Sequence, residues 1–179
     1  MASGYNFSFF KLSVINMQER NIRFLNALIG LGCFGAIAFA YFYLEHTLFM
    51  TPCPLCMMQR LAFGLIGLAF LLDALIAPKS YGRWLLGAFK FLVIFFGIAL
   101  AARHLWIQSL PPDQVPSCGL DFYALMKRNT LFDGLWQAMQ GDGDCATKDT
   151  WLGLSIPMWS MLLYVGLLLL AVVVRPRGR

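Results

Sequence analysis

Long apolar runs alternate with polar segments along most of this chain. Four runs cover residues 24–44, 61–77, 84–107 and 152–174. Crossing the hydrocarbon core of a bilayer takes about 20 residues of helix, and the second run is near the minimum. The pattern therefore predicts an all-α membrane protein, a four-transmembrane-helix bundle that forms a single domain over residues 1–179.

Two polar segments separate these runs on one side of the predicted bundle, at residues 45–60 and 108–151. Apolar residues recur at near-helical spacing in the longer one: Phe122, Leu125, Met126, Phe132, Leu135, Trp136 and Met139. This spacing predicts a short amphipathic helix, or a pair of short helices, at the membrane surface. Ordinary packing beneath a loop fits the same spacing.

Single residues inside the runs carry further expectations. Gly32, Ala36 and Ala40 lie four apart in the first run, which favours close approach of another helix. Asp73 near the end of the second run is expected close to the lipid headgroups, and Lys90 is expected to extend toward them. Ala38-Phe39-Ala40 resembles a signal-peptide cleavage site, but the apolar run continues past it, which favours a span.

Composition supports the membrane assignment. Apolar residues make up 59% of the chain and charged residues 13%, about half the usual charged fraction of a soluble domain. The net charge is +5, but the basic residues flank apolar runs instead of forming a stripe, so nucleic acid is not expected as a partner. Their excess before residue 24, over 78–90 and after 174 places both termini in the cytoplasm and both loops outside.

Four of the five cysteines fall in the two outer loops. Cys53 and Cys56 lie in one loop, Cys118 and Cys145 in the other, and Cys33 lies in the first run, where it is expected to be a small packing residue. Cysteines on an oxidising face form disulfides. A bridge from Cys118 to Cys145 closes about 28 residues and would stabilise the fold by roughly 3–4 kcal/mol.

The CxxC pair is harder to explain as a structural bridge, because its loop is too small to constrain much of the unfolded chain. CxxC is typical of reversible dithiol chemistry. A four-cysteine zinc site is an alternative, but only one half has zinc-finger spacing, so no metal site is predicted. Pro54 is expected as the first residue of the second helix, with Cys53 near its N-cap.

Polar groups on two helix ends point to the same place. Arg60 follows Cys56 by one helical turn and can stabilise a thiolate or a neighbouring anion. His104 and Gln108 lie on one face at the end of the third run, where they can donate hydrogen bonds to a carbonyl oxygen. Together these residues predict a pocket for a lipid-soluble carbonyl compound such as a quinone.

The chain resembles a known family, the disulfide-bond formation protein B (DsbB) thiol oxidases of the bacterial inner membrane. The resemblance rests on local strings in a fixed order: Cys53-Pro54-Leu55-Cys56 with Arg60, Ala77-Pro78-Lys79, His104 with Gln108, Gly143-Asp144-Cys145, Trp151-Leu152-Gly153-Leu154 and Pro157-Met158-Trp159.

The resemblance implies that the chain is an enzyme, a thiol:quinone oxidoreductase. It would reoxidise a DsbA-like periplasmic thiol oxidase and pass the electrons to ubiquinone or menaquinone. Cys118 would form the mixed disulfide with the partner, Cys145 would be its bridge partner, and Cys53 with Cys56 would take up the electrons. Cys56 would face the quinone, in a site shaped by Arg60, His104 and Gln108.

Two other readings remain open from the residues. A vitamin K epoxide reductase-like enzyme also couples a CxxC to a quinone, although its CxxC is expected after the loop pair. A membrane scaffold with structural disulfides or zinc would need no redox activity. The resting disulfide connectivity is open too, including a bridge from Cys53 to the second loop.

Overall fold

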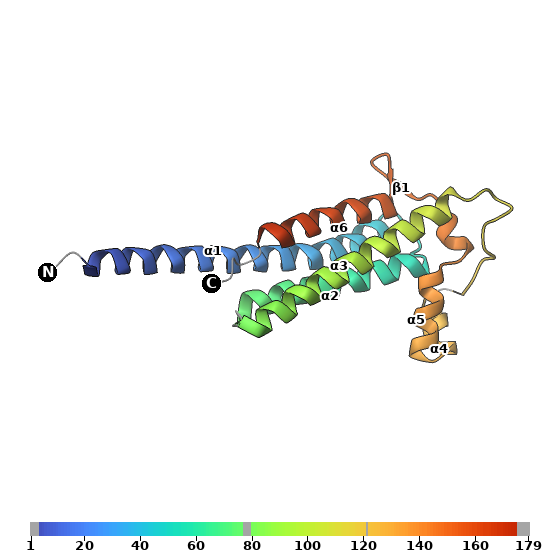
Figure 1. Cartoon of the computed structure of the whole chain (residues 1–179). Coiled ribbons are helices and arrows are strands. Elements are labelled where there is room, and N and C mark those ends of the chain that lie inside the picture. The colour runs from blue at the N-terminus through green and yellow to red at the C-terminus, as the bar shows by residue number, and fades with distance from the viewer. Residues whose placement is uncertain (1–3, 77–79, 121, 175–179) are drawn as a thin grey trace.

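A computed structural model describes residues 4–76, 80–120 and 122–174 (Figure 1). Four long helices form its body: α1 (Gly4–Phe39), continued by the π-helix η1 (Ala40–Glu45), then α2 (Pro54–Ile76), α3 (Ser80–Ser109) and α6 (Ile156–Val173). The second loop adds α4 (Phe122–Arg128), α5 (Leu131–Gln140), the 3-10 helix η2 (Gly143–Ala146) and a hairpin of β1 (Thr150–Trp151) and β2 (Leu154–Ser155).

The four long helices lie side by side, with α2 packed between α1 and α3, and α3 against α6 (Figure 1). Each contains a segment long and apolar enough to cross a membrane: Arg20–Glu45, Pro54–Ile76, Tyr81–Ser109 and Ile156–Val173. Large apolar side chains such as Phe24, Leu92 and Leu169 point outward, as expected where lipid replaces water. The predicted all-α four-helix membrane fold is confirmed.

One predicted helix start is confirmed and another was wrong. The second helix begins at Pro54, as predicted, seven residues before the apolar run, so it contains Cys56. The fourth begins at Ile156 because Leu152 and Gly153 have positive φ angles of 51° and 83° and turn the β1–β2 hairpin. An apolar run shows hydrophobicity but does not show backbone conformation. The amphipathic segment forms a pair of helices, α4 and α5.

The close contact between α1 and α2 is made by glycines other than the one predicted. A Cβ added at Gly30 would lie 2.9 Å from the carbonyl oxygen of Gly67, whereas one added at Gly32 would meet nothing within 4 Å. The expectation of close helix approach at Gly32 was therefore wrong. Gly32 does not face α2. Ala36 and Ala40, which follow it along α1, line a cavity instead of a close helix contact.

A buried ion pair joins α2 and α3 near their connection. The Lys90 ammonium lies 2.5 Å from the Asp73 carboxylate, and Asn26 of α1 donates to the same oxygen at 3.4 Å. Lys90 also lies over the Phe70 ring. Lys90, which was expected to extend toward the lipid headgroups, pairs with a carboxylate inside the bundle that stabilises its charge.

Tyr164 connects α6 to the other two central helices. Its ring stacks on Phe63 with centroids 4.3 Å apart, and its hydroxyl donates to the Gln59 carbonyl at 2.7 Å. A Cβ at Gly97 of α3 would lie 2.3 Å from this ring, so the packing requires glycine there. This contact fixes the part of α2 that begins just after the CxxC.

Candidate active site

The N-terminus of α2 holds the CxxC pair. Cys53 precedes the helix and Cys56 lies in its first turn, with their Sγ atoms 3.1 Å apart. The Cys56 amide donates to Cys53 Sγ at 3.3 Å, and the Met57 amide donates to the Cys53 carbonyl at 3.2 Å. Cys53 therefore caps α2, as predicted, and its sulfur lies at the positive end of the helix dipole.

The second loop brings Cys145 to the same place. Cys145 lies in η2 and is fully buried, with 0% of its surface exposed. Its Sγ, the Cys53 Sγ and a ring nitrogen of His104 from α3 all lie within 4.8 Å of one another. We call Cys53, Cys56, Cys145 and His104 the thiol cluster. Its assembly joins residues from two loops and two helices.

Hydrogen bonds shift the pKa values of the two loop thiols in this cluster, Cys53 and Cys145, in opposite directions. The Cys53 thiol, as a donor, lowers the pKa of Cys145, and the backbone N–H groups of Asp142 and Leu55 act in the same direction. The same contact with Cys145, together with Cys56 and burial, raises the pKa of Cys53. Burial also raises the pKa of Asp142, whose carboxylate lies 3.5 Å from Cys145 Sγ. Cys145 is thus the more easily ionised of these two thiols.

His104 and Gln108 both serve the thiol cluster and its loop. His104 is buried, with Nε2 3.8 Å from Cys53 Sγ and Nδ1 3.3 Å from the Gln59 amide. Gln108 donates to the Thr147 carbonyl at 2.8 Å, which fastens the segment after Cys145 to α3. The residues that line the adjacent cavity do not include either side chain.

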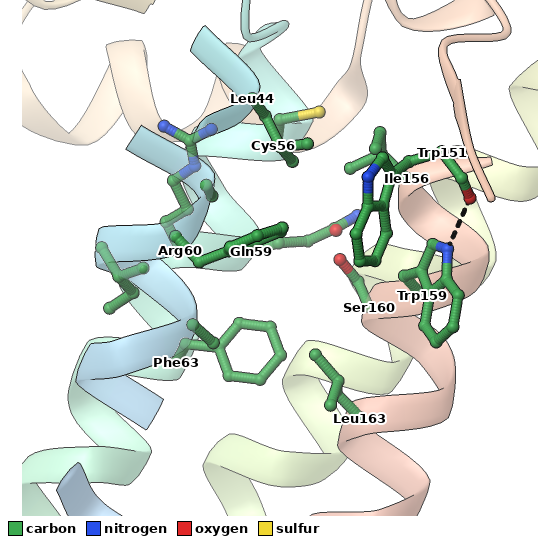
Figure 2. Close-up of a pocket in the computed structure, with 14 residues that line it drawn as sticks. Leu44, Cys56, Gln59, Arg60, Phe63, Trp151, Ile156, Trp159, Ser160 and Leu163 are labelled. Atoms are coloured by element: carbon green, nitrogen blue, oxygen red, sulfur yellow. Dashed lines mark hydrogen bonds between the residues drawn. The ribbon is translucent and has the colours of Figure 1, made fainter. Parts of the chain in front are cut away.

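That cavity, of about 370 Å³, lies between α1, α2, α6 and the hairpin. Figure 2 shows Cys56, Gln59 and Arg60 on one side and Trp159 and Ser160 on the other. Most of the remaining wall is apolar, and the volume is in the range of small-molecule sites. Cys56 is the member of the thiol cluster that reaches this cavity.

Arg60 lies in the cavity wall and pairs with the Glu45 carboxylate at the end of η1. On the opposite wall, the Trp159 indole donates to the Trp151 carbonyl at 2.9 Å and fixes the hairpin over the cavity (Figure 2). The sequence reasoning did not identify Glu45 or Gln59 as site residues. Gln59 had a usable signal, since it is a polar residue beside Arg60 in the first turns of an apolar helix.

Cys118 is exposed, unlike the buried Cys53 and Cys145. Its segment lies against the one that leads to Cys145, because the Gly143 amide donates to the Ser117 carbonyl at 3.1 Å. All five cysteines are described, and each is a free thiol. Cys33 packs in the core beside Gly67, consistent with a packing role.

A helical membrane bundle with reactive thiols gathered beside an apolar cavity defines a class of membrane thiol redox proteins. The family model of disulfide bond formation protein DsbB matches residues 22–174. Disulfide bond formation protein B of Hahella chejuensis is 42% identical over 155 residues, covering 84% of this chain and 89% of that protein. The Marinobacter nauticus protein of the same name is 40% identical over 157 residues, covering 87% and 92%.

This chain therefore belongs to the DsbB family, as the sequence strings indicated. It is a multi-pass membrane protein with a role in disulfide bond formation.

Proposed function

We propose that this protein is a thiol:quinone oxidoreductase of the bacterial inner membrane. It oxidises the dithiol of a DsbA-like periplasmic oxidase and passes the electrons to ubiquinone or menaquinone. One observation carries the proposal: a buried thiol cluster reaches an apolar cavity through Cys56, while Cys118 is exposed on the loop side. One end of the proposed electron route, Cys118, is thus exposed at the surface, and the other end, Cys56, faces an apolar cavity.

The first exchange takes place at Cys118. A thiolate of the soluble partner attacks the Cys118 sulfur of a Cys118–Cys145 disulfide, forms a mixed disulfide and releases Cys145 as a thiolate. The exposure of Cys118 supports its role as the attacked sulfur, because a folded partner cannot reach the fully buried Cys145. The hydrogen bonds from the backbone N–H groups of Asp142 and Leu55 favour the Cys145 thiolate as the leaving group.

The second exchange transfers the oxidising equivalent between the loops. The Cys145 thiolate attacks Cys53 of a Cys53–Cys56 disulfide and releases Cys56 as a thiolate. The partner's second thiolate then attacks the mixed disulfide, which releases the Cys118 thiolate and the oxidised partner. The Cys118 thiolate attacks Cys145 in the Cys53–Cys145 disulfide and releases the Cys53 thiolate. The net result is an oxidised partner, a restored Cys118–Cys145 bridge and two reduced thiols at Cys53 and Cys56. The short distance between Cys53 and Cys145 supports this order.

The residues around the cavity fit a quinone head group. The wall is largely apolar, its volume is about 370 Å³, and Cys56, Gln59 and Arg60 supply its polar groups on α2. A bound quinone would supply a two-electron, two-proton acceptor, which would return the two thiols of Cys53 and Cys56 to a disulfide. Arg60 stabilises negative charge at Cys56 or at a nearby carbonyl oxygen. His104 and Gln108 shape this site from the thiol side, by holding Cys53 and the segment after Cys145.

The decisive experiment uses the full chain in lipid nanodiscs with a reduced DsbA-type protein and ubiquinone-1, and a parallel series with a menaquinone analogue. We expect one quinone reduced for each partner dithiol oxidised, that is, for every two partner thiols lost. Cys56→Ser should abolish turnover, because no thiol then reaches the cavity. Cys33→Ala, at a packing cysteine, is the matched control and should retain turnover.

Full activity of Cys56→Ser, or thiol oxidation without quinone, would defeat the proposal. A redox titration of the CxxC distinguishes this oxidoreductase from a membrane scaffold with structural disulfides. In a scaffold the Cys53–Cys56 pair would stay oxidised under mild reductant.

A further inference from the structure

The thiol cluster also has the composition of a metal site. Cys53 Sγ, Cys145 Sγ and a ring nitrogen of His104 lie within 4.8 Å of one another, and all three residues are buried. Thiolate sulfur and imidazole nitrogen are preferred zinc ligands, at bond lengths of about 2.3 and 2.0 Å. We propose that the fully reduced protein binds one Zn²⁺ ion between Cys53, Cys145 and His104, with Cys56 as fourth ligand.

Cys53, Cys145 and His104 need only small side-chain shifts to bind one ion, whereas Cys56 lies outside this group and must turn its sulfur toward the ion. Ligand atoms around a tetrahedral zinc lie roughly 3.5–4 Å apart, and Cys53 Sγ is already 3.8 Å from His104 Nε2. Cys56 Sγ lies 3.1 Å from Cys53 Sγ. A CxxC pair is a usual half of a zinc site, and the N-terminus of α2 stabilises the negative charge of its thiolates.

The surroundings of His104 support a ligand role. A zinc-bound imidazole normally donates its other N–H to an oxygen, which fixes the ring. The Gln59 carboxamide lies 3.3 Å from His104 Nδ1. With its oxygen turned toward the ring it accepts that N–H, since the two ends of an amide are interchangeable by a flip. Nε2 then faces Cys53 as the free ligand atom.

This site differs from the four-cysteine alternative that the sequence suggested, and it departs from the prediction of no metal. His104 takes the place of Cys118, which is exposed. Binding moves no electrons: each bound thiol releases its proton to water and becomes a zinc-bound thiolate. A disulfide at Cys53 removes two ligands, so oxidised protein does not bind, and bound zinc keeps Cys53 and Cys56 from forming a disulfide.

The test is a metal titration of the full chain in detergent, reduced anaerobically, with Co²⁺ as the absorbing probe and Zn²⁺ as competitor. We expect one ion per chain, a sulfur-to-cobalt charge-transfer band that Zn²⁺ removes, and proton release on binding. Oxidised protein should show none of these. This readout requires neither quinone nor partner, so its failure leaves the proposed electron route standing.

Four variants decide which residues bind. Cys145→Ser and His104→Asn should each weaken Zn²⁺ by about 100-fold, one ligand's share of a four-ligand site. Cys118→Ser and Cys33→Ala should bind as the parent does. Circular dichroism of each variant excludes loss of the fold as the cause. Unchanged affinity in His104→Asn or Cys145→Ser, or loss of binding in Cys118→Ser, would overturn the assignment.

Discussion

At the scale of single residues, Arg60 shows how a side chain acquires a function through its neighbours. A cation at the end of an apolar run is usually a boundary residue. Here its side chain lies in the cavity wall with Cys56 and pairs with Glu45. Arg103, on α3, offers a contrast: it contacts the Gln140 carbonyl at 3.2 Å and is absent from the residues that line this cavity.

Replacing the guanidinium at the cavity should weaken the acceptor site. We expect Arg60→Met to raise the KM for ubiquinone by about 10-fold, since a hydrogen bond to a charged group contributes roughly 1.5–3 kcal/mol. Steady-state quinone reduction at saturating partner measures this. Arg103→Met is the matched control and should leave the KM unchanged. Equal effects of the two substitutions would mean that Arg60 acts only at the membrane boundary.

At the scale of elements, α2 is the helix on which the site depends. Its N-terminus stabilises the sulfur of Cys53, and its first turns place Gln59 and Arg60 in the cavity wall. Gly67, further along α2, makes the close contact with Gly30 of α1. At its other end, the Arg23 guanidinium donates to the Ala74 carbonyl at 2.8 Å, which complements the negative end of the helix dipole. A change in how α1 packs against α2 would therefore alter the cavity that both helices line.

The contact of α1 with α2 makes a prediction within one helix. Gly30→Ala should lower the free energy of unfolding by about 1–3 kcal/mol, because the added methyl group meets the Gly67 carbonyl and Leu71. Gly32→Ala should cause no loss, since its Cβ meets nothing within 4 Å. SDS titration in mixed micelles, followed by circular dichroism, measures both. A similar loss in both variants would contradict this helix contact.

At the scale of the whole molecule, the two ends of the bundle carry different chemistry. The second loop, with α4, α5 and β1, lies at one end of the bundle (Figure 1). The thiol cluster and the cavity are formed by residues at this end. The Asp73–Lys90 ion pair lies near the opposite end, close to the connection of α2 and α3. Such a molecule can exchange thiols on one side of a membrane only, so its orientation matters for its proposed role.

Surface labelling tests this orientation. In a cysteine-free background, Phe49→Cys in the first loop should react with a membrane-impermeant maleimide on intact spheroplasts. Tyr81→Cys at the start of α3 should react only after permeabilisation. Both side chains are well exposed on the protein, at 83% and 74%, so packing within the protein does not limit either reaction. Labelling of Tyr81→Cys from outside would reverse the proposed topology.

Much of the fold was predictable because its determinants are local. Four apolar runs define four helices through their length alone, and Pro54 after Cys53 predicted the N-terminus of α2. The hairpin that shortens the fourth helix was not predictable from hydrophobicity, because Leu152 and Gly153 begin the apolar run while their positive φ angles place them in a turn before the helix.

The sequence by itself determined the helices, the end of the bundle that carries both thiol pairs, and the cation one turn from Cys56, since each depends on neighbouring residues. Only the tertiary structure decided that Cys145 lies beside Cys53, that His104 joins the sulfurs instead of the cavity wall, and that Lys90 turns inward to Asp73. These contacts join different helices and loops, and the packing of those helices, not their local sequence, determines which side chains meet.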